Sequence, residues 1–203
     1  MEGEEVMEDL PLKGKRVAII CANEFEDIEV FYPLLRLSEE GAGIVLATLP
    51  TPGWSPRPFV PGKPITGRFG LTVPPPWLRE GERYTVQPVA ALRPADLDAV
   101  VIPGGFSPDY MRRDPSTVSL VRDAVAAGKV VAAICHGPWL LFSAEVVRGK
   151  RITGFSSIRD DAVHAGAQWV DAPVVRDGAL ITSRTPDDLP QFCRAIIDAL
   201  REG

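Results

Sequence analysis

Short apolar runs rich in β-branched residues recur along this chain, and stretches with helical periodicity lie between them. The runs are RVAIIC (16–21), IVLAT (44–48), DAVVI (98–102) and VVAAI (130–134). Runs of this length without polar alternation are typical of strands that are buried on both faces. Strands that alternate with helices predict an α/β fold, a three-layer sandwich in which a mostly parallel central sheet carries helices on both faces.

Several helices are predicted between and after these strands. Ile28, Phe31, Tyr32 and Leu35 follow the spacing of a buried helical stripe, in a helix that ends near Gly41. Another helix begins at Asp114-Pro115, and shorter helices are expected over 138–144 and 157–165. The last helix starts at Thr185-Pro186 and is expected to bury a stripe made of Leu189, Phe192, Cys193, Ile196, Ile197 and Leu200. Asp177-Gly178 predicts a hairpin between strands at 174–175 and 180–182.

One region interrupts the alternation. Eleven of the 20 prolines lie between residues 50 and 94, where proline removes backbone donors and excludes a central strand or a long helix. We interpret this region as an ordered excursion with short edge strands near 70–73 and 84–86, anchored by Trp54, Phe59, Phe69 and Trp77. The 203 residues therefore predict an acidic tail over 1–14 and a single domain over 15–203.

Charge and composition exclude several classes of function. The net charge is −5 and no basic stripe is present, so nucleic acid is not an expected partner. The acidic start is not that of a signal peptide, and no apolar run is long enough to span a membrane. Three cysteines indicate a reducing, cytoplasmic compartment rather than a disulfide framework. With two histidines and neither glycine-rich nucleotide motif, no metal or cofactor is expected.

The segment VVAAICHGPWLL (130–141) carries the most specific chemical signal. An apolar strand delivers Cys135 to a sharp turn before a helix, which is the geometry of a nucleophile elbow. We expect free N–H groups and the dipole of the new helix to lower the pKa of the thiol, and Gly137 to allow the tight turn. Cys21 and Cys193 are expected to be core residues, and His164 to lie on the surface.

Two other strand ends offer groups that suit this thiol. Glu26 and Glu29 begin the first helix, where acids oppose the helix dipole, and one of them is placed to turn inward as a proton donor to sulfur. Gly104 and Gly105 follow the strand at 98–102 and offer backbone N–H groups for an oxyanion hole, although a plain turn is the alternative. The carboxyl ends of parallel strands meet at one edge, so these groups are expected to converge.

Five segments resemble the ThiJ/PfpI family, in its intracellular-protease branch. They are ANEFEDIE (22–29), VVIPGGFSPDYMR (100–112), AAICHGPWLL (132–141), IRDDAVHAGAQWVD (158–171) and SRTPDDLPQF (183–192). The resemblance implies the flavodoxin-like fold of class I glutamine amidotransferases. It also implies Cys135 as catalytic cysteine, His136 as the adjacent histidine and Glu29 as the acid, with Glu26 nearby.

The resemblance also implies a homo-oligomer, since in this branch an acidic residue of a neighbouring subunit contacts the histidine. The matching position is Asp109. Phe155 stands where many relatives carry tyrosine, and the excursion is longer and richer in proline than in the family. His136 is therefore expected to act on the sulfur only when a partner supplies Asp109.

Three functions remain open at this stage. The first is attack of Cys135 on reactive aldehydes or their adducts, as in the glyoxalase III and deglycase members that protect against carbonyl stress, with Glu29 moving a proton between carbons. The second is an oligomeric cysteine peptidase or amidase with His136 as base. The third is a redox sensor or chaperone in which Cys135 is oxidised to sulfinate.

Overall fold

A seven-stranded sheet forms the centre of the computed structural model, which describes residues 10–50, 60 and 63–203. The strand order is β10-β11-β7-β6-β1-β2-β5. Its strands are β1 (Arg16–Cys21), β2 (Gly43–Thr48), β5 (Tyr84–Pro88), β6 (Ala99–Ile102), β7 (Val130–Ile134), β10 (Val174–Asp177) and β11 (Leu180–Ser183). Neighbouring strands are parallel except the β10–β11 hairpin, so the predicted mostly parallel sheet is confirmed.

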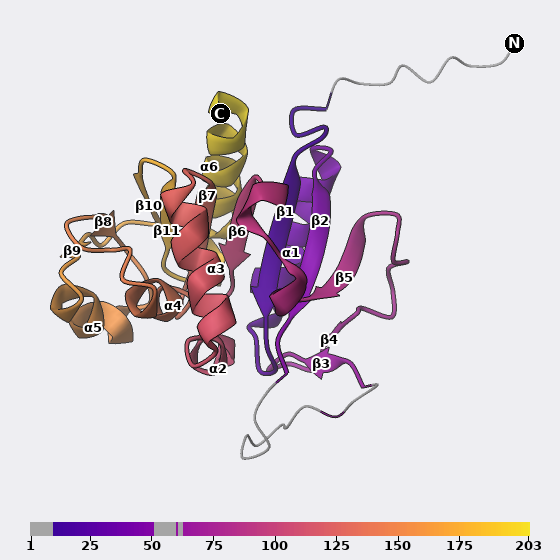
Figure 1. Ribbon diagram of the computed structural model, residues 1–203, viewed down its shortest axis with the longest axis horizontal. Helices are drawn as coiled ribbons and strands as arrows, with labels where there is room; N and C mark the ends of the chain where they lie inside the picture. The colour runs from indigo at the N-terminus through magenta and orange to yellow at the C-terminus, as the bar shows by residue number, and fades with distance from the viewer. Residues whose placement is uncertain (1–9, 51–59, 61–62) are drawn as a thin grey trace, which may run out of the picture.

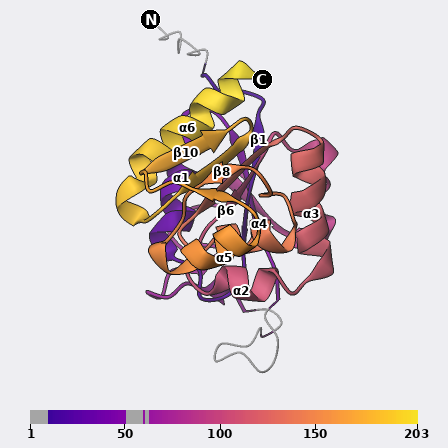
Figure 2. The same ribbon diagram turned by 90° about the vertical axis from the view of Figure 1, so that its left-hand side faces the viewer.

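Helices cover both faces of this sheet, as predicted. They are α1 (Asp27–Glu39), α2 (Ser107–Met111), α3 (Pro115–Ala126), α4 (Pro138–Ser143), α5 (Arg159–His164) and α6 (Leu189–Glu202). Figure 1 shows the order of the elements, and in Figure 2 α1 and α6 lie on one side of the strands while α3 lies on the other. Two small sheets lie outside: β3 (Ile65–Thr66) with β4 (Thr72–Val73), and β8 (Arg151–Ile152) with β9 (Gln168–Trp169).

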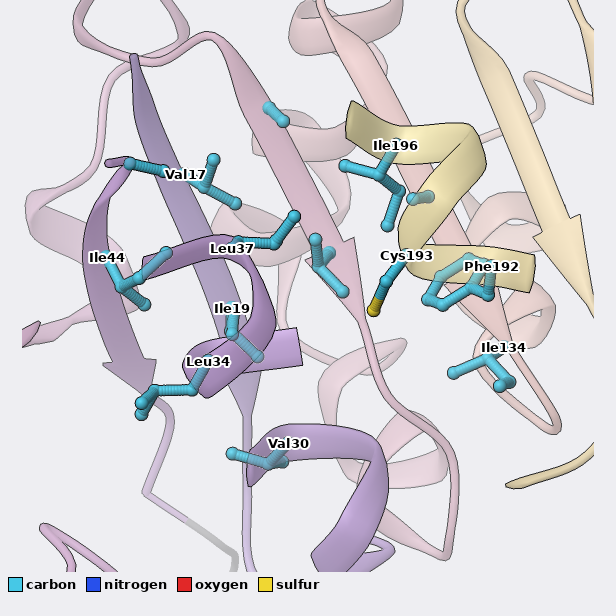
Figure 3. Packing of buried hydrophobic residues seen from close by; sticks show 14 of the residues in the cluster. Val17, Ile19, Val30, Leu34, Leu37, Ile44, Ile134, Phe192, Cys193 and Ile196 are labelled. Atoms are coloured by element: carbon cyan, nitrogen blue, oxygen red, sulfur yellow. The ribbon is translucent and has the colours of Figure 1, made fainter. Parts of the chain in front are cut away.

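The predicted stripe of α6 packs as expected. Phe192, Cys193 and Ile196 are fully buried against the sheet and against α1, in one contiguous apolar cluster (Figure 3). Cys21 is also fully buried at the end of β1, so both cysteines expected in the core are there. The Asp114 carboxylate accepts a hydrogen bond from the Thr117 N–H at 2.8 Å, which confirms the predicted cap of α3.

The predicted buried stripe of α1 is confirmed at Phe31, which is 5% exposed, and was wrong at Ile28 and Leu35. Ile28 is 49% exposed and Leu35 is 40% exposed, whereas Val30, Leu34 and Leu37 are fully buried. The helix carries two overlapping apolar stripes, and periodicity alone does not choose between them. The structure uses the stripe that also turns the carboxyl groups of Asp27 and Glu29 inward, where they accept hydrogen bonds from backbone N–H groups.

The described part of the proline-rich region agrees with an ordered excursion. β4 lies within the predicted segment 70–73, and β5 begins at the predicted residue 84, continues to Pro88 and is an edge strand of the main sheet. Phe69 does not anchor the region, since it is 75% exposed, while Trp77 packs edge-on against Phe31 with ring centroids 5.2 Å apart. The predicted anchors Trp54 and Phe59, and residues 1–9 of the acidic tail, lie outside the described residues. The sequence interpretation missed α2 and the short strands β3, β8 and β9.

The hairpin of β3 and β4 is tied to the start of α1. The Asp27 carboxylate accepts hydrogen bonds from the N–H groups of Phe69 (2.9 Å) and Leu71 (2.7 Å). The Thr66 N–H donates to the Asn23 side chain at 2.7 Å. These bonds hold the hairpin at the carboxyl end of β1.

None of the described helices is long and apolar enough to cross a membrane.

Candidate active site

Cys135 lies on the strained turn that the sequence predicts between β7 and α4. Its φ is 60°, a left-handed conformation that disfavours residues with a Cβ by roughly 1–2 kcal/mol. The flanking backbone holds it there: the Cys135 N–H donates to the Ser183 carbonyl at 3.1 Å, and the Phe155 N–H donates to the Cys135 carbonyl at 2.9 Å. Strain that is maintained in this way is typical of functional sites.

Glu29 brings a buried carboxyl group to this cysteine. The residue is fully buried, and its Oε2 accepts a hydrogen bond from the Gly104 N–H at 2.7 Å. Oε1 has no conventional hydrogen-bond partner among the described residues, and the Cys135 thiol is the side chain that interacts with this carboxyl. A Cβ added at Gly104 would lie 2.7 Å from the Cys135 Cβ and 2.8 Å from Glu29 Oε2. The side chains of Cys135 and Glu29 therefore both pack against Gly104.

Burial keeps this pair protonated. It raises the pKa of Glu29 to about 8, although the Gly104 N–H opposes the shift. The pKa of the Cys135 thiol is also raised, to about 12, by burial and then by the negative charge of Glu29. The predicted lowering of the thiol pKa was therefore wrong. α4 has only six residues, and burial outweighs its N-terminus. The Cys135 thiolate forms more readily while Glu29 is protonated, because the protonated carboxyl carries no negative charge beside the sulfur.

His136 reaches the sulfur within a single chain. Its Nδ1 lies 3.3 Å from the Cys135 Sγ, and its Nε2 lies 3.2 Å from the Ser157 hydroxyl oxygen. The imidazole stacks on Phe155 at 5.0 Å and meets the Trp139 ring edge-on at 4.9 Å. Burial, and then the positive charge of Arg68, lower its pKa, so it is neutral at pH 7 and suited to accept a thiol proton. The contact with sulfur thus does not require the expected partner subunit.

Two backbone N–H groups point toward the sulfur. Those of Gly105 and His136 oppose the rise in the thiol pKa, as donors to a developing negative charge do. Gly104 does not fill the oxyanion role that the sequence suggested, because its N–H is bound by Glu29. Gly137 is a turn residue: its N–H donates to the Ile134 carbonyl at 2.8 Å, and a Cβ there would lie 2.4 Å from the Ile102 carbonyl oxygen.

The other two candidate acids lie farther from the thiol. Glu26 occupies the N-cap position of α1 without a capping hydrogen bond from its side chain, and it forms an ion pair with Arg68 at 3.0 Å. Burial raises its pKa. Asp109, on α2, is half-buried, and its carboxylate makes no hydrogen bond or ion pair with residues of the described ranges. Only Glu29 of the three acids therefore contacts Cys135 within the described part of this chain.

A cavity of about 480 Å³ lies behind Phe155. Its lining includes apolar rings and charged groups, from Gly154, Phe155, Ser156, Arg159, Trp169, Asp171, Arg184 and Thr185. The sequence interpretation missed this cavity, Ser157 and Arg68, because all three depend on contacts between distant segments. Among the described residues, no cluster of three or more His, Cys, Asp or Glu side chains is arranged to hold a metal ion.

Replacing Gly104 with alanine is expected to lower activity at least about tenfold, because the new methyl group would push Cys135 and Glu29 apart. Steady-state kinetics with an α-oxoaldehyde checks this, and thermal unfolding shows whether the fold survives. Gly43→Ala is the matched control, since a Cβ there would be 3.8 Å from its nearest neighbour. Equal kinetics for both variants would contradict the close packing of this pair.

Comparisons with known proteins show the family of this chain. The model of the DJ-1/PfpI family matches residues 15–199. A protein named as a deglycase from Pyrococcus horikoshii is 39% identical over 186 residues, covering 92% of this chain and 99% of the relative. A protein from Bacillus subtilis named as a putative cysteine protease is 36% identical over 189 residues, covering 93% of this chain and 99% of the relative.

The fold is shared with solved structures of the same group. Drosophila melanogaster DJ-1beta superposes with a TM-score of 0.76 at 26% identity, over 93% of this chain and 91% of that one. The parallel sheet with helices on both faces is thus the flavodoxin-like fold that the sequence indicated. The names of the relatives support an enzyme. The chain belongs to the DJ-1/PfpI family.

Proposed function

We propose that this protein is a cofactor-independent, deglycase-like enzyme that attacks reactive carbonyl carbons with Cys135 and serves to limit carbonyl stress. The observation that carries the proposal is the buried, protonated carboxyl of Glu29 against the thiol. A carboxyl with a pKa near 8 is suited to give a proton to an oxygen and then take one from carbon at neutral pH. The family relatives named as deglycases support the same class of reaction.

In the first step, the Cys135 thiol passes its proton to the neutral His136 Nδ1 and the sulfur attacks the aldehyde carbon of methylglyoxal. The S–C bond forms as the carbonyl π bond breaks, and Glu29 protonates the oxygen to give a hemithioacetal. The N–H groups of Gly105 and His136 face the charge that develops near the sulfur. On a glycated amine, the same attack at the carbinolamine carbon expels the free amine, which takes the proton.

In the second step, the Glu29 carboxylate removes the hydrogen of the attacked carbon and returns it to the neighbouring carbon. The intermediate enediol becomes an S-lactoyl thioester, with the hydroxyl proton moved from one oxygen to the other. Water then cleaves the S–C bond, and Cys135, His136 and Glu29 return to their starting protonation states. The balance is methylglyoxal plus water giving lactate and one proton, with no oxidant or reductant.

The test compares wild type with Cys135→Ser on methylglyoxal and on an unstructured protein. We expect wild type to form lactate and the variant to form none above background. If wild type consumes neither substrate faster than the variant, both enzyme hypotheses fail. Ready oxidation of Cys135 to sulfinate, detected by mass spectrometry, would then favour the redox-sensor alternative.

A second candidate is a cysteine peptidase, which the Cys135–His136–Ser157 arrangement favours. In this alternative His136 is the base toward sulfur and later protonates the leaving amine. The Bacillus subtilis relative named as a putative cysteine protease supports it.

We also propose a homo-oligomer in which Asp109 contacts a neighbouring subunit. Sedimentation of wild type and Asp109→Ala would test this proposal.

Ser157→Ala is expected to lower kcat about tenfold with a smaller change in KM, because the hydroxyl can accept from Nε2–H and so stabilise the tautomer in which Nδ1 is unprotonated. Steady-state kinetics with methylglyoxal between pH 6 and 9 measures it. Ser157→Thr, which keeps a hydroxyl, serves as the control and should restore most of the rate. Loss of activity in both variants alike would contradict a role through the hydrogen bond.

A further inference from the structure

The hairpin of β3 and β4 fixes Arg68 beside the candidate active site. The Arg68 N–H donates to the Phe25 carbonyl at 2.9 Å, and a Cβ at Gly67 would lie 2.4 Å from an Asp27 carboxylate oxygen. The backbone of the hairpin is therefore packed directly on the first turn of α1, the turn that also carries Glu29.

The guanidinium of Arg68 presents an open hydrogen-bonding edge. One nitrogen, Nη1, donates to Glu26 at 3.0 Å, and Cζ lies 5.8 Å from the ring centroids of both Phe69 and Phe106. Nε and Nη2 have no partner among the described residues, and the side chain is 45% exposed. An arginine held by two rings and one carboxylate keeps a planar pair of N–H donors available to an anion.

This charge lies close to the reacting groups. Phe106 directly follows Gly105, whose N–H faces the sulfur, and its ring touches Arg68. The positive charge of Arg68 also helps to lower the pKa of His136 and opposes the rise in the pKa of Glu29. Of the neighbouring acids, Glu26 balances part of the charge, and the Asp27 carboxylate is occupied by the N–H groups of the hairpin.

We propose that Arg68 is a specificity-determining residue that binds a carboxylate of the substrate through Nε and Nη2. The favoured substrates are then α-oxoaldehydes, or glycation adducts, that carry an acidic group a few bonds from the reacting carbonyl. This inference rests on the proposed function, because it names the substrate class of the same site. The alternative is that Arg68 only holds Glu26 and the hairpin.

The kinetic test uses 4,5-dioxopentanoate and its uncharged methyl ester, which share one reacting group. We expect wild type to prefer the acid, and Arg68→Met to lower the ratio of the two kcat/KM values about tenfold, the size of one charge-assisted hydrogen bond at a partly exposed site. Effects of the substitution on the pKa values of Glu29 and His136 act on both substrates and cancel in the ratio. Arg68→Lys keeps the charge without the planar fork and should fall between.

Arg159→Met is the matched control, because Arg159 is an exposed arginine that lines the separate cavity behind Phe155. A ratio lowered by Arg159→Met and not by Arg68→Met would move the anion site to that cavity and overturn the inference. Equal loss on acid and ester in Arg68→Met would show that the residue only supports the structure, and would also overturn it.

A second readout does not depend on turnover. Titration of ¹⁵N-labelled protein with 4-oxopentanoate is expected to shift the Nε–H resonance that disappears in Arg68→Met, while uncharged 2-pentanone leaves it in place. A shift without turnover of either aldehyde would retain the anion site and reject the proposed function. Turnover of both aldehydes without a shift and without a change in ratio would reject the anion site alone.

Discussion

Cys135→Ser is expected to lower the rate of lactate formation from methylglyoxal by at least about 10³-fold. An alcohol at this position cannot match a thiol as a nucleophile, even with His136 at 3.3 Å and two N–H groups facing the atom. Steady-state assays with purified wild type and variant measure the difference.

Cys193→Ala provides the control for this substitution. Cys193 is fully buried on α6, away from the turn, and its loss should leave the rate within about twofold while costing about 1 kcal/mol of unfolding free energy. A Cys135→Ser protein that keeps more than a tenth of the wild-type rate would show that the sulfur is not the nucleophile.

Glu29→Gln is expected to lower kcat by roughly 10²–10⁴-fold, because the amide keeps the shape of the side chain but cannot transfer a proton. Its oxygen can still accept the Gly104 N–H, so the fold should be kept. Glu26→Gln, on the same helix turn, is the comparison and should cause a much smaller loss, since Glu26 pairs with Arg68 rather than the thiol. Equal losses in the two variants would reject Glu29 as the proton carrier.

The same variant changes the pH dependence of stability. The pKa of Glu29 is about 8 in the folded chain against an ordinary value of 4.5, so between these values the folded state holds a proton that the unfolded state has lost. The contribution of Glu29 to stability is thus fully present below about pH 4.5 and is lost as the pH rises through about 8. The unfolding free energy that this group contributes falls with pH by at most about 1.4 kcal/mol per pH unit. Urea unfolding at pH 5 to 9 should show this fall in wild type and a flatter curve in Glu29→Gln; parallel curves would mean that Glu29 is ionised in the folded chain.

The sequence predicted most of the sheet because its strands are buried on both faces and bounded by clear turn residues. Val130–Ile134 followed by Cys-His-Gly-Pro specified both the strand and the turn, and the structure places Cys135 there. The sequence prediction failed on part of α1, where two apolar stripes compete and the outcome depends on which backbone N–H groups donate to Asp27 and Glu29. Such partners come from the hairpin and from Gly104, which local periodicity does not report.

The electrostatics of the site were the least predictable part. The turn and helix start suggested an acidic thiol, but the degree of burial is a property of the packed chain, and it raises the pKa values of both Cys135 and Glu29. In the same way, the contact of Ser157 with His136 joins segments 21 residues apart, so no local sequence pattern predicts it. Residue types were therefore predictable where backbone geometry required them, and charge states were not.

The central claim is that the substrate carbon becomes bonded to the Cys135 sulfur. Acid quench of wild type within milliseconds of mixing with ¹³C-labelled methylglyoxal, followed by peptide mass spectrometry, tests it most directly. The account predicts the label on the peptide that contains Cys135, and its absence when Glu29→Gln is combined with Cys135→Ser. Lactate formed at the full rate with label only on lysine or arginine side chains, or on no peptide, would contradict it.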